Sequence, residues 1–134
     1  MRHQRAEQPL RLAGPEAARD FFAGCFAESD PARETLWVAH IDQDSNCLHV
    51  SRHEGDAVEA EFPLRSIIID AALHDSAGIL LAHNHPSGDA SPSASDCTAT
   101  RRLACVSDAM GCRVVDHFVF GGANICSLRE LGLL

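Results

Sequence analysis

The sequence predicts an α/β fold in one domain, with helices on both faces of a mixed β-sheet. Segments whose apolar residues recur at helical spacing alternate with short apolar segments of strand character. The chain has 134 residues, which suits one domain, and we expect no second one. Hydrophobic residues make up 46% of the chain and charged residues 22%, which is typical of globular proteins and excludes the disordered class.

The N-terminal half is expected to contain one helix followed by strands. Apolar residues at helical spacing predict a helix over residues 15–27. Residues 35–41 and 47–53 have strand character and flank the polar turn 42–46, which indicates an antiparallel hairpin. A third strand is expected over residues 57–62.

The C-terminal half is expected to alternate helices with further strands. One helix begins at Pro63, which suits a first helical turn, and keeps a 3.6-residue apolar period as far as Ala72. A second helix begins at Pro92 and ends near Met110. Three strands complete this half, over residues 78–82, 112–120 and 125–128.

Several side chains of the kind that bind metal ions follow the strand 78–82. His83 and His85 are two residues apart, so on an extended chain both rings project to the same side. Asp96 lies in the first turn of the next predicted helix, and Ser93 lies three positions earlier on the same helical face. Two imidazoles and one carboxylate, with a fourth position left to water, are the ligand set of a catalytic rather than a structural zinc site. The sequence therefore predicts one Zn²⁺ per chain, bound by His83, His85 and Asp96.

The spacing of these residues resembles the motif of the JAMM (MPN+) metallopeptidases. That motif is His-x-His-Pro, a serine with seven residues between it and the second histidine, and then x-x-Asp, and the chain matches it at His83, His85, Ser93 and Asp96. Flanking segments look more narrowly like the bacterial RadC branch of this family. These segments are residues 83–89, 100–103, 116–121 and 127–133.

The resemblance covers most of the chain and implies both its domain organisation and its fold. It divides the chain into an N-terminal arm, residues 1–13, and a RadC-like JAB/MPN domain, residues 14–134. It also implies the JAB/MPN fold, a cytidine-deaminase-like arrangement in three layers. The deaminases themselves use His/Cys/Cys ligands with a Pro-Cys-x-x-Cys segment, which this chain lacks.

By the same resemblance, a glutamate upstream of the motif accepts a proton from the attacking water. Glu34 fits this position because it stands directly before the predicted strand 35–41. Glu54, Glu59 and Glu61 fit it less well. The alternative role for Glu34 is that of a solvated loop carboxylate, which most glutamates before a strand have.

The implied reaction is hydrolysis of a peptide or isopeptide bond by metal-activated water, which makes the expected protein a JAMM-type zinc metallopeptidase. Zinc lowers the pKa of bound water from about 15.7 to about 7 and polarises the scissile carbonyl. Glu34 would act as base and then as acid toward the leaving amine, and Ser93 would donate a hydrogen bond to the oxyanion. A serine nucleophile is the poorer explanation, because His83 and His85 are better used as ligands.

A second class of function stays open at this stage. It is a metal-binding accessory module associated with DNA repair or mobile-element biology, which keeps the ion but cleaves no amide. The intact ligands and Glu34 favour the hydrolase, whose expected partner is a peptide or protein-conjugate substrate of unknown identity. Nucleic acid is not an expected partner, because the formal net charge is −8 and the acidic excess falls within residues 28–75. The oligomeric state is not predicted.

The composition also bears on the compartment. The six cysteines form no C-x-x-C pair and show no regular spacing, so we expect free, buried thiols in a reducing compartment. No segment is apolar over enough residues to cross a membrane, and the N-terminus lacks an apolar signal core. The expected location is therefore the cytoplasm.

The remaining histidines are expected at the surface or as hydrogen-bonded core residues. His117 is different, because Asp116-His117 matches a position of the family. A histidine there is expected either to be a structural strand residue or to hydrogen-bond a metal-bound imidazole from outside the ligand set.

Overall fold

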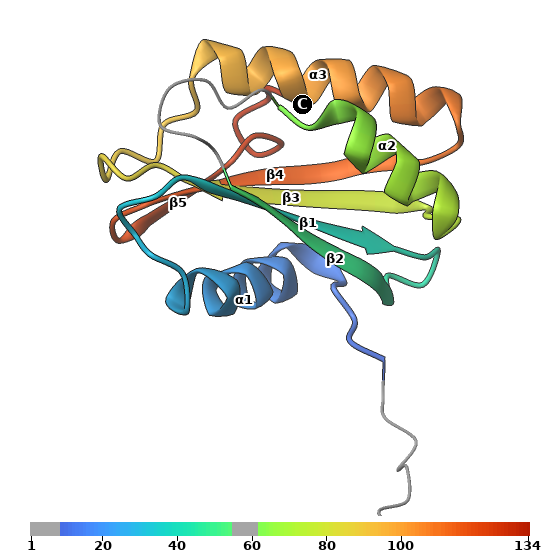
Figure 1. Cartoon of the computed structure of the whole chain (residues 1–134), viewed down its shortest axis with the longest axis horizontal. Helices are drawn as coiled ribbons and strands as arrows, with labels where there is room; N and C mark the ends of the chain where they lie inside the picture. Colours follow the sequence, from blue (N-terminus) through green and yellow to red (C-terminus); the bar gives the residue numbers. More distant parts are fainter. Residues whose placement is uncertain (1–8, 55–61) are drawn as a thin grey trace, which may run out of the picture.

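A five-stranded mixed β-sheet lies between two layers of helices. The computed structural model of the protein describes residues 9–54 and 62–134. The helix α1 (Gly14–Ala27) covers one face of the sheet, and α2 (Leu64–Leu73) and α3 (Ala94–Ala109) cover the other (Figure 1). These three layers confirm the predicted α/β fold, with a mixed sheet flanked by helices.

The strands lie in the order β2-β1-β3-β4-β5 across the sheet. Of the described strands, only β3 and β4 run parallel to each other, because α3 carries the chain from the end of β3 back to the start of β4. The other neighbouring strands are antiparallel. The bounds are Thr35–Ile41 for β1, Cys47–Glu54 for β2, Gly78–Asn84 for β3, Arg113–Gly121 for β4 and Asn124–Ser127 for β5.

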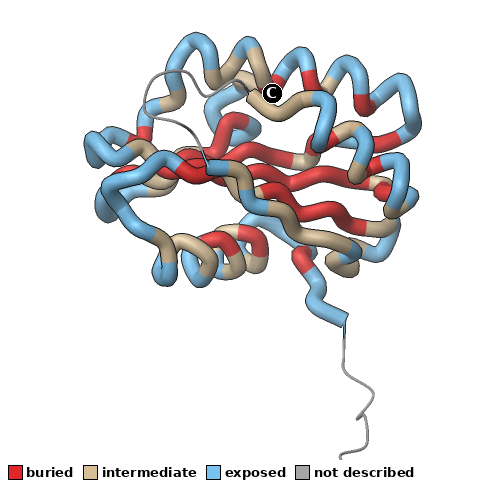
Figure 2. The backbone as a smooth tube through the Cα atoms, in the orientation of Figure 1, coloured by how far each residue is buried: buried red, intermediate tan, exposed pale blue. Residues whose placement is uncertain are grey.

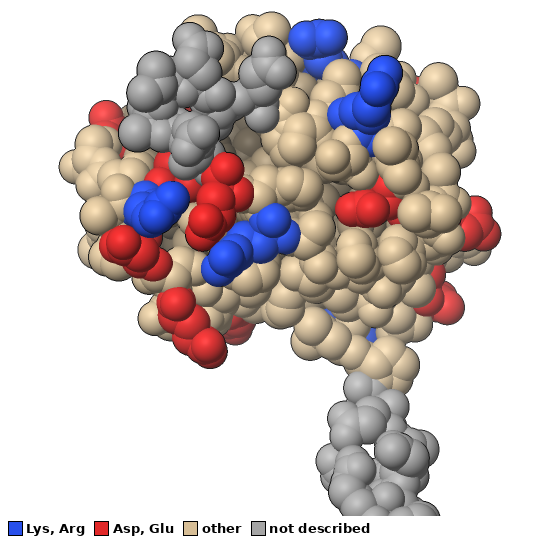
Figure 3. Space-filling model, viewed as in Figure 1, with Lys and Arg blue, Asp and Glu red and all other residues tan. Residues whose placement is uncertain are grey.

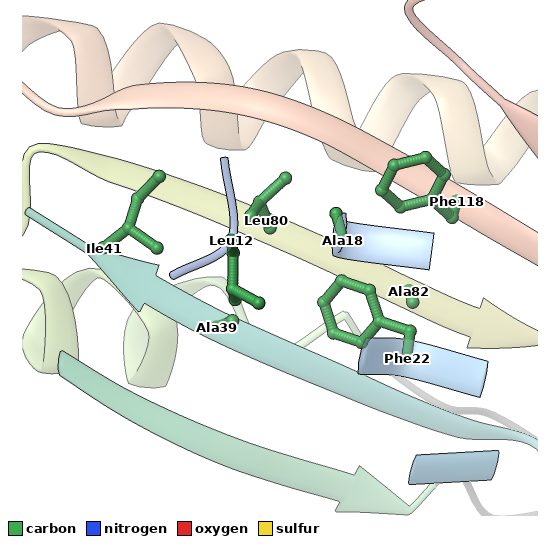
Figure 4. Packing of buried hydrophobic residues seen from close by; sticks show 8 residues of the cluster. All are labelled: Leu12, Ala18, Phe22, Ala39, Ile41, Leu80, Ala82 and Phe118. Atoms are coloured by element: carbon green, nitrogen blue, oxygen red, sulfur yellow. The ribbon is translucent and has the colours of Figure 1, made fainter. Parts of the chain in front are cut away.

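The central strand β3 is buried along its whole length, because helices cover the sheet on both sides (Figure 2). Leu80 and Ala82 belong to the core on the α1 side (Figure 4). Ile79 and Leu81 belong to the core beneath α2 and α3. Since side chains alternate along a strand, His83 projects to the same side as Leu81, toward α3.

The length of β3 differs from the prediction. The sequence indicates a strand that ends at Ala82, whereas β3 continues to Asn84. It continues because His83 is paired on both sides, with Leu36 of β1 and with Val119 of β4. The first histidine of the motif therefore lies within the strand rather than after it.

The other predicted elements in the described residues are confirmed, with ends that differ by one or two residues. The predicted hairpin is present, as are the three predicted helices. The predicted strand over residues 57–62 lies almost entirely outside the described residues. None of the helices in the described part of the chain combines the length and the apolar character that a membrane crossing needs.

Residues 10–12, which the sequence assigns to the N-terminal arm, pair with the hairpin of β1 and β2. The carbonyl of Leu10 accepts a hydrogen bond from the N–H of Cys47, and the N–H of Leu12 donates to the carbonyl of Ser45. The side chain of Leu12 is buried in the core on the α1 side. The core thus includes a residue that precedes the predicted start of the domain.

The six cysteines are free thiols, as the sequence predicts, but the prediction that they are buried is wrong for most of them. Cys112 is buried, Cys105 is exposed, and the other four are partly exposed. A helix that covers a sheet buries only one of its faces, and Cys105 lies on the outward face of α3.

Candidate metal centre

The predicted metal ligands meet where β3 ends and α3 begins. His83 is near the end of β3, His85 lies just beyond it, and Asp96 lies in the first turn of α3. The parallel strands β3 and β4 both end at this edge of the sheet. The carboxyl ends of strands are where open α/β sheets commonly bind ligands.

Three ligand atoms converge at this edge. His83 Nε2 lies 3.0 Å from His85 Nε2 and 3.3 Å from Asp96 Oδ2, and His85 Nε2 lies 3.1 Å from the same oxygen. Zinc holds histidine nitrogens at about 2.0–2.1 Å, so tetrahedral ligand atoms are about 3.4 Å apart. The observed separations approach this value. Within residues 9–54 and 62–134, this is the one group of three or more His, Cys, Asp or Glu side chains whose ligand atoms converge in this way.

The hydrogen-bond partners of His83 fix which of its nitrogens carries the proton. Thr100 Oγ1 donates to the carbonyl oxygen of Asp96 at 2.7 Å, because a carbonyl can only accept. The hydroxyl then accepts from Nδ1 of His117 at 2.7 Å, which leaves Nε2 of that ring as an acceptor. Nδ1 of His83 therefore donates to His117 Nε2 at 2.7 Å, and Nε2 of His83 carries no proton.

The loop after β3 holds His85 in the same tautomer. Its Nδ1 lies 2.8 Å from the carbonyl oxygen of Asp89, which can only accept, so the proton is on Nδ1. When both rings are neutral, two unprotonated nitrogens and one carboxylate oxygen thus face one another at 3.0–3.3 Å without a donor among them. Three acceptors at this distance repel one another unless a proton or a metal cation lies between them. The residues present therefore fit a divalent metal ion.

Asp96 is both a member of this group and part of the cap of α3. The Ser93 hydroxyl accepts a hydrogen bond from the N–H of Asp96 at 3.0 Å, and the N–H of Ser93 donates to Asp96 Oδ2 at 2.8 Å. Burial raises the pKa of the Asp96 carboxyl, but positive charge at the His83 nitrogen that faces it and the hydrogen bonds with Ser93 outweigh burial and hold the pKa well below its usual range. The carboxylate is therefore ionised, as a metal ligand must be.

Ser93 itself is exposed at the start of α3. Its hydroxyl accepts the capping bond from Asp96 and lies 3.2 Å from Ser95 Oγ. Accepting uses a lone pair, so the hydroxyl proton remains available for donation. The role of Ser93 toward an oxyanion stays a prediction.

His117 is the partner of a ligand, in agreement with one of its two expected roles. Burial lowers the pKa of His117 well below the ordinary value, so the ring is neutral and can accept from His83 while it donates to Thr100. Asp116 Oδ1 accepts from the N–H of His117 at 2.7 Å and holds the backbone there. The sequence reasoning missed Thr100, although its place one helical turn after Asp96 puts both residues on the same face of α3.

Glu34 lies beside this site and is not one of the converging ligands. It is exposed and directly precedes β1, which pairs with β3. The side chain of Asn84 bonds the backbone on both sides of it, since Oδ1 accepts from the N–H of Thr35 at 2.7 Å and Nδ2 donates to the carbonyl of Arg33 at 2.9 Å. The sequence reasoning gave Asn84 no role. Proton transfer by Glu34 stays a prediction.

The loop that carries His85 packs closely against the end of β4. The N–H of His85 donates to the carbonyl of Phe120 at 2.8 Å. A Cβ atom at Gly121 would lie 2.4 Å from the backbone nitrogen of Ala90. Only glycine permits the backbone of the loop to come so close to β4. This close packing sets the position of the Asp89 carbonyl, which fixes the tautomer of His85.

Three further histidines form a separate cluster between α2 and the sheet. His40 of β1 is paired with His49 of β2, and the His49 ring stacks on His74 with a centroid separation of 4.2 Å. His40 is fully buried, and its Nδ1 lies 3.1 Å from Ser76 Oγ. Among the described residues, the ligand atoms of this cluster do not converge as those of the metal centre do.

The charged side chains of the described residues are dispersed on the face that Figure 3 shows. Basic side chains stand there in small groups between acidic and uncharged ones (Figure 3). Glu54, for example, lies 3.3 Å from the guanidinium of Arg52 and 4.0 Å from that of Arg33. The described residues on this face form no continuous basic surface of the kind that neutralises a phosphate backbone.

Comparison with known proteins agrees with this description. The RadC-like JAB domain family matches residues 12–133. The UPF0758 protein YfjY of Escherichia coli is 34% identical over 134 residues, which cover 99% of this chain and 82% of that protein. The UPF0758 protein YkfG of the same organism is 37% identical over 103 residues, which cover 76% of this chain and 65% of that protein.

A UPF0758 protein of Pelobacter propionicus is 32% identical over 132 residues, which cover 98% of this chain and 57% of that protein. A three-layer domain in which two histidines and an aspartate converge at the end of a central strand is a domain of the JAB type. The chain belongs to the RadC-like JAB domain family. The names of these relatives state no activity.

Proposed function

We propose that the protein is a zinc-dependent hydrolase of peptide or isopeptide bonds. The observation that carries this proposal is the convergence of two histidine nitrogens and a carboxylate oxygen within 3.0–3.3 Å of one another. The side chains of His85 and Asp96 are each 17% exposed, so solvent and substrate can reach them. A structural zinc site has four protein ligands, whereas this group offers three.

The chain supplies the groups that such a reaction needs beside the ligands. A zinc ion held by them provides a water of lowered pKa and a Lewis acid for the scissile carbonyl. Glu34 accepts a proton from the attacking water and returns it to the leaving amine. Its carboxylate is exposed, and its backbone is fixed beside the site. Ser93 donates a hydrogen bond to the oxyanion, because its capping bond from Asp96 uses only a lone pair of the hydroxyl.

The proposed substrate is a peptide or a protein conjugate. An amide bond fits the combination of a Lewis acid, a proton acceptor and an oxyanion donor, because the leaving amine must gain the proton that the water loses. Membership of the JAB domain family, which includes hydrolases, supports the same reaction.

Metal analysis and a peptide-library cleavage screen on the wild type and Glu34→Gln test this function. We expect one zinc ion per chain in both proteins, cleavage that a chelator abolishes, and turnover at least about 10²-fold lower in the variant. Glu16→Gln is the matched control, because Glu16 is exposed on α1, on the opposite face of the sheet, and should keep full activity.

Two outcomes of this experiment would change the conclusion. Equal turnover by the wild type and Glu34→Gln would remove Glu34 from the reaction. Zinc binding without cleavage of any library peptide by the wild type would instead favour a metal-binding accessory module.

A further inference from the structure

We propose that Asn84 is a positioning residue, whose side-chain amide holds Glu34 at the mouth of the metal centre. This inference rests on the proposed function, in which Glu34 transfers the proton. Asn84 stands between the two histidine ligands in the chain, yet the group of converging ligand atoms does not include it. Its amide is instead directed at the segment before β1.

The Asn84 side chain makes one hydrogen bond on each side of Glu34. Oδ1 accepts from the N–H of Thr35 at 2.7 Å, and Nδ2 donates to the carbonyl of Arg33 at 2.9 Å. Asn84 is 9% exposed and Thr35 is 3% exposed, so water competes little for these bonds. The peptide groups before and after Glu34 are thus both attached to β3.

Strand pairing alone does not hold Glu34 in place. The ladder between β1 and β3 begins with Leu36 opposite His83, and the ladder between β1 and β2 begins with Thr35 opposite Glu54. Among the described residues, Glu34 precedes both ladders, so neither of these ladders holds its backbone. The Asn84 amide attaches the segment to β3 at the point where the backbone ladder stops.

The chemistry of the side chain suits this task. A side chain that hydrogen-bonds two successive peptide groups, one through its N–H and one through its carbonyl, needs both an acceptor and a donor. A carboxamide provides both on one short side chain. A catalytic group that is displaced by about 1 Å can lose about 10²-fold in rate. Because Asn84 follows His83 and precedes His85, the same strand end sets the place of two ligands and of the proton acceptor.

Amide hydrogen exchange tests the two hydrogen bonds of the Asn84 side chain without any substrate. In the zinc-loaded protein, Asn84→Ala should make the Thr35 amide exchange about tenfold faster and leave the zinc content unchanged. Asn124→Ala is the matched control, because Asn124 is exposed at the turn between β4 and β5. An unchanged Thr35 exchange rate in Asn84→Ala overturns the proposal.

A double-mutant cycle tests whether Asn84 acts through Glu34. With the library peptide that the wild type cleaves fastest, Asn84→Ala should lower kcat by about 10- to 100-fold at unchanged KM. In the Glu34→Gln background the same substitution should cause no further loss, because the group that it positions is already gone. An equal loss in both backgrounds indicates a merely structural role and overturns the proposal.

Failure of the proposed function is distinguishable from failure of this inference. If the wild type cleaves nothing, the hydrolase proposal fails, and the NMR signals of Glu34 in the Co²⁺-loaded protein still decide the position of this residue. The metal should broaden or shift them strongly in the wild type and clearly less in Asn84→Ala. Equal effects in both proteins overturn the role of Asn84.

If Asn84→Ala does not fold, two further measurements still test the proposal. Asn84→Ser keeps a polar strand residue but is too short to reach both peptide groups, and should show the same loss of Thr35 protection. In the wild type, a Thr35 amide that exchanges as fast as that of Glu34 overturns the proposal by itself.

Discussion

At His83, the protonation state of one nitrogen depends on two residues that the metal does not touch. His117 Nε2 accepts a hydrogen bond from Nδ1 of His83, and it can do so only because Nδ1 of His117 donates its own hydrogen bond to Thr100. Thr100 in turn gives its only proton to the carbonyl of Asp96. The tautomer of His83 thus depends on the hydrogen bond between Thr100 and the backbone carbonyl of Asp96. Both ligands, His83 and Asp96, therefore depend on the first turns of α3.

Removal of the Thr100 hydroxyl should therefore weaken zinc binding. Thr100 is fully buried, and valine has nearly the same volume, so Thr100→Val removes the hydrogen bonds with little change in packing. We expect the zinc affinity at neutral pH to fall by about 10- to 100-fold, measured by competition with a chromophoric chelator. Thr98→Val, at an exposed position of the same helix, should bind zinc as the wild type does. If Thr100→Val keeps the wild-type affinity, the tautomer of His83 does not depend on this chain of bonds.

At the scale of elements, the metal centre depends on how closely the loop after β3 approaches the end of β4. The loop supplies the Asp89 carbonyl that orients His85, and it can take its position because Gly121 has no side chain. The atoms that a side chain at Gly121 would meet are backbone atoms, which cannot rotate away as a flexible side chain can.

Gly121→Ala should accordingly disturb both the fold and the site. The added Cβ would lie 2.4 Å from the nitrogen of Ala90, so the loop and β4 must separate. We expect urea unfolding to show a loss of about 1–3 kcal/mol in the free energy of unfolding, and zinc binding to weaken because the Asp89 carbonyl moves away from His85.

Gly24→Ala is the control for this substitution. Gly24 lies in α1, and a Cβ there would meet nothing within 4 Å, so the variant should be as stable as the wild type or up to about 1 kcal/mol more stable. A wild-type zinc affinity in Gly121→Ala would mean that the loop position does not control His85.

On the scale of the whole molecule, the sequence predicts the fold class, but the parts of the site that it predicts are local. The spacing of His83 and His85 and the place of Asp96 in a first helical turn needed no knowledge of strand pairing. The contacts of Asn84 and Thr100 join segments from different layers or strands, and only the assembled sheet brings these together. The extension of β3 to Asn84 has the same cause, because it depends on partners in β1 and β4.

The histidine cluster beneath α2 connects the stability of the whole molecule with pH. Burial lowers the pKa of His40 to about 4, the nearby Asp70 opposes this shift, and His49, His74 and His53 add to it. His40 belongs to the same face of the sheet as the core beneath α2, so its protonation would place a charge in that core.

The sign of the pH dependence follows from the position of this pKa. An unfolded histidine takes up a proton near pH 6.5, whereas His40 in the folded protein does so only near pH 4. Between these values the unfolded state binds more protons, so stability is complete above about pH 6.5 and is lost as the pH falls toward 4. His40 alone should contribute a loss of about 2–3 kcal/mol between pH 8 and pH 4.5. Urea unfolding of the zinc-free protein at both pH values measures it, and His40→Gln should reduce the difference by about that amount. A variant that loses as much stability on acidification as the wild type would show that other groups cause the acid sensitivity.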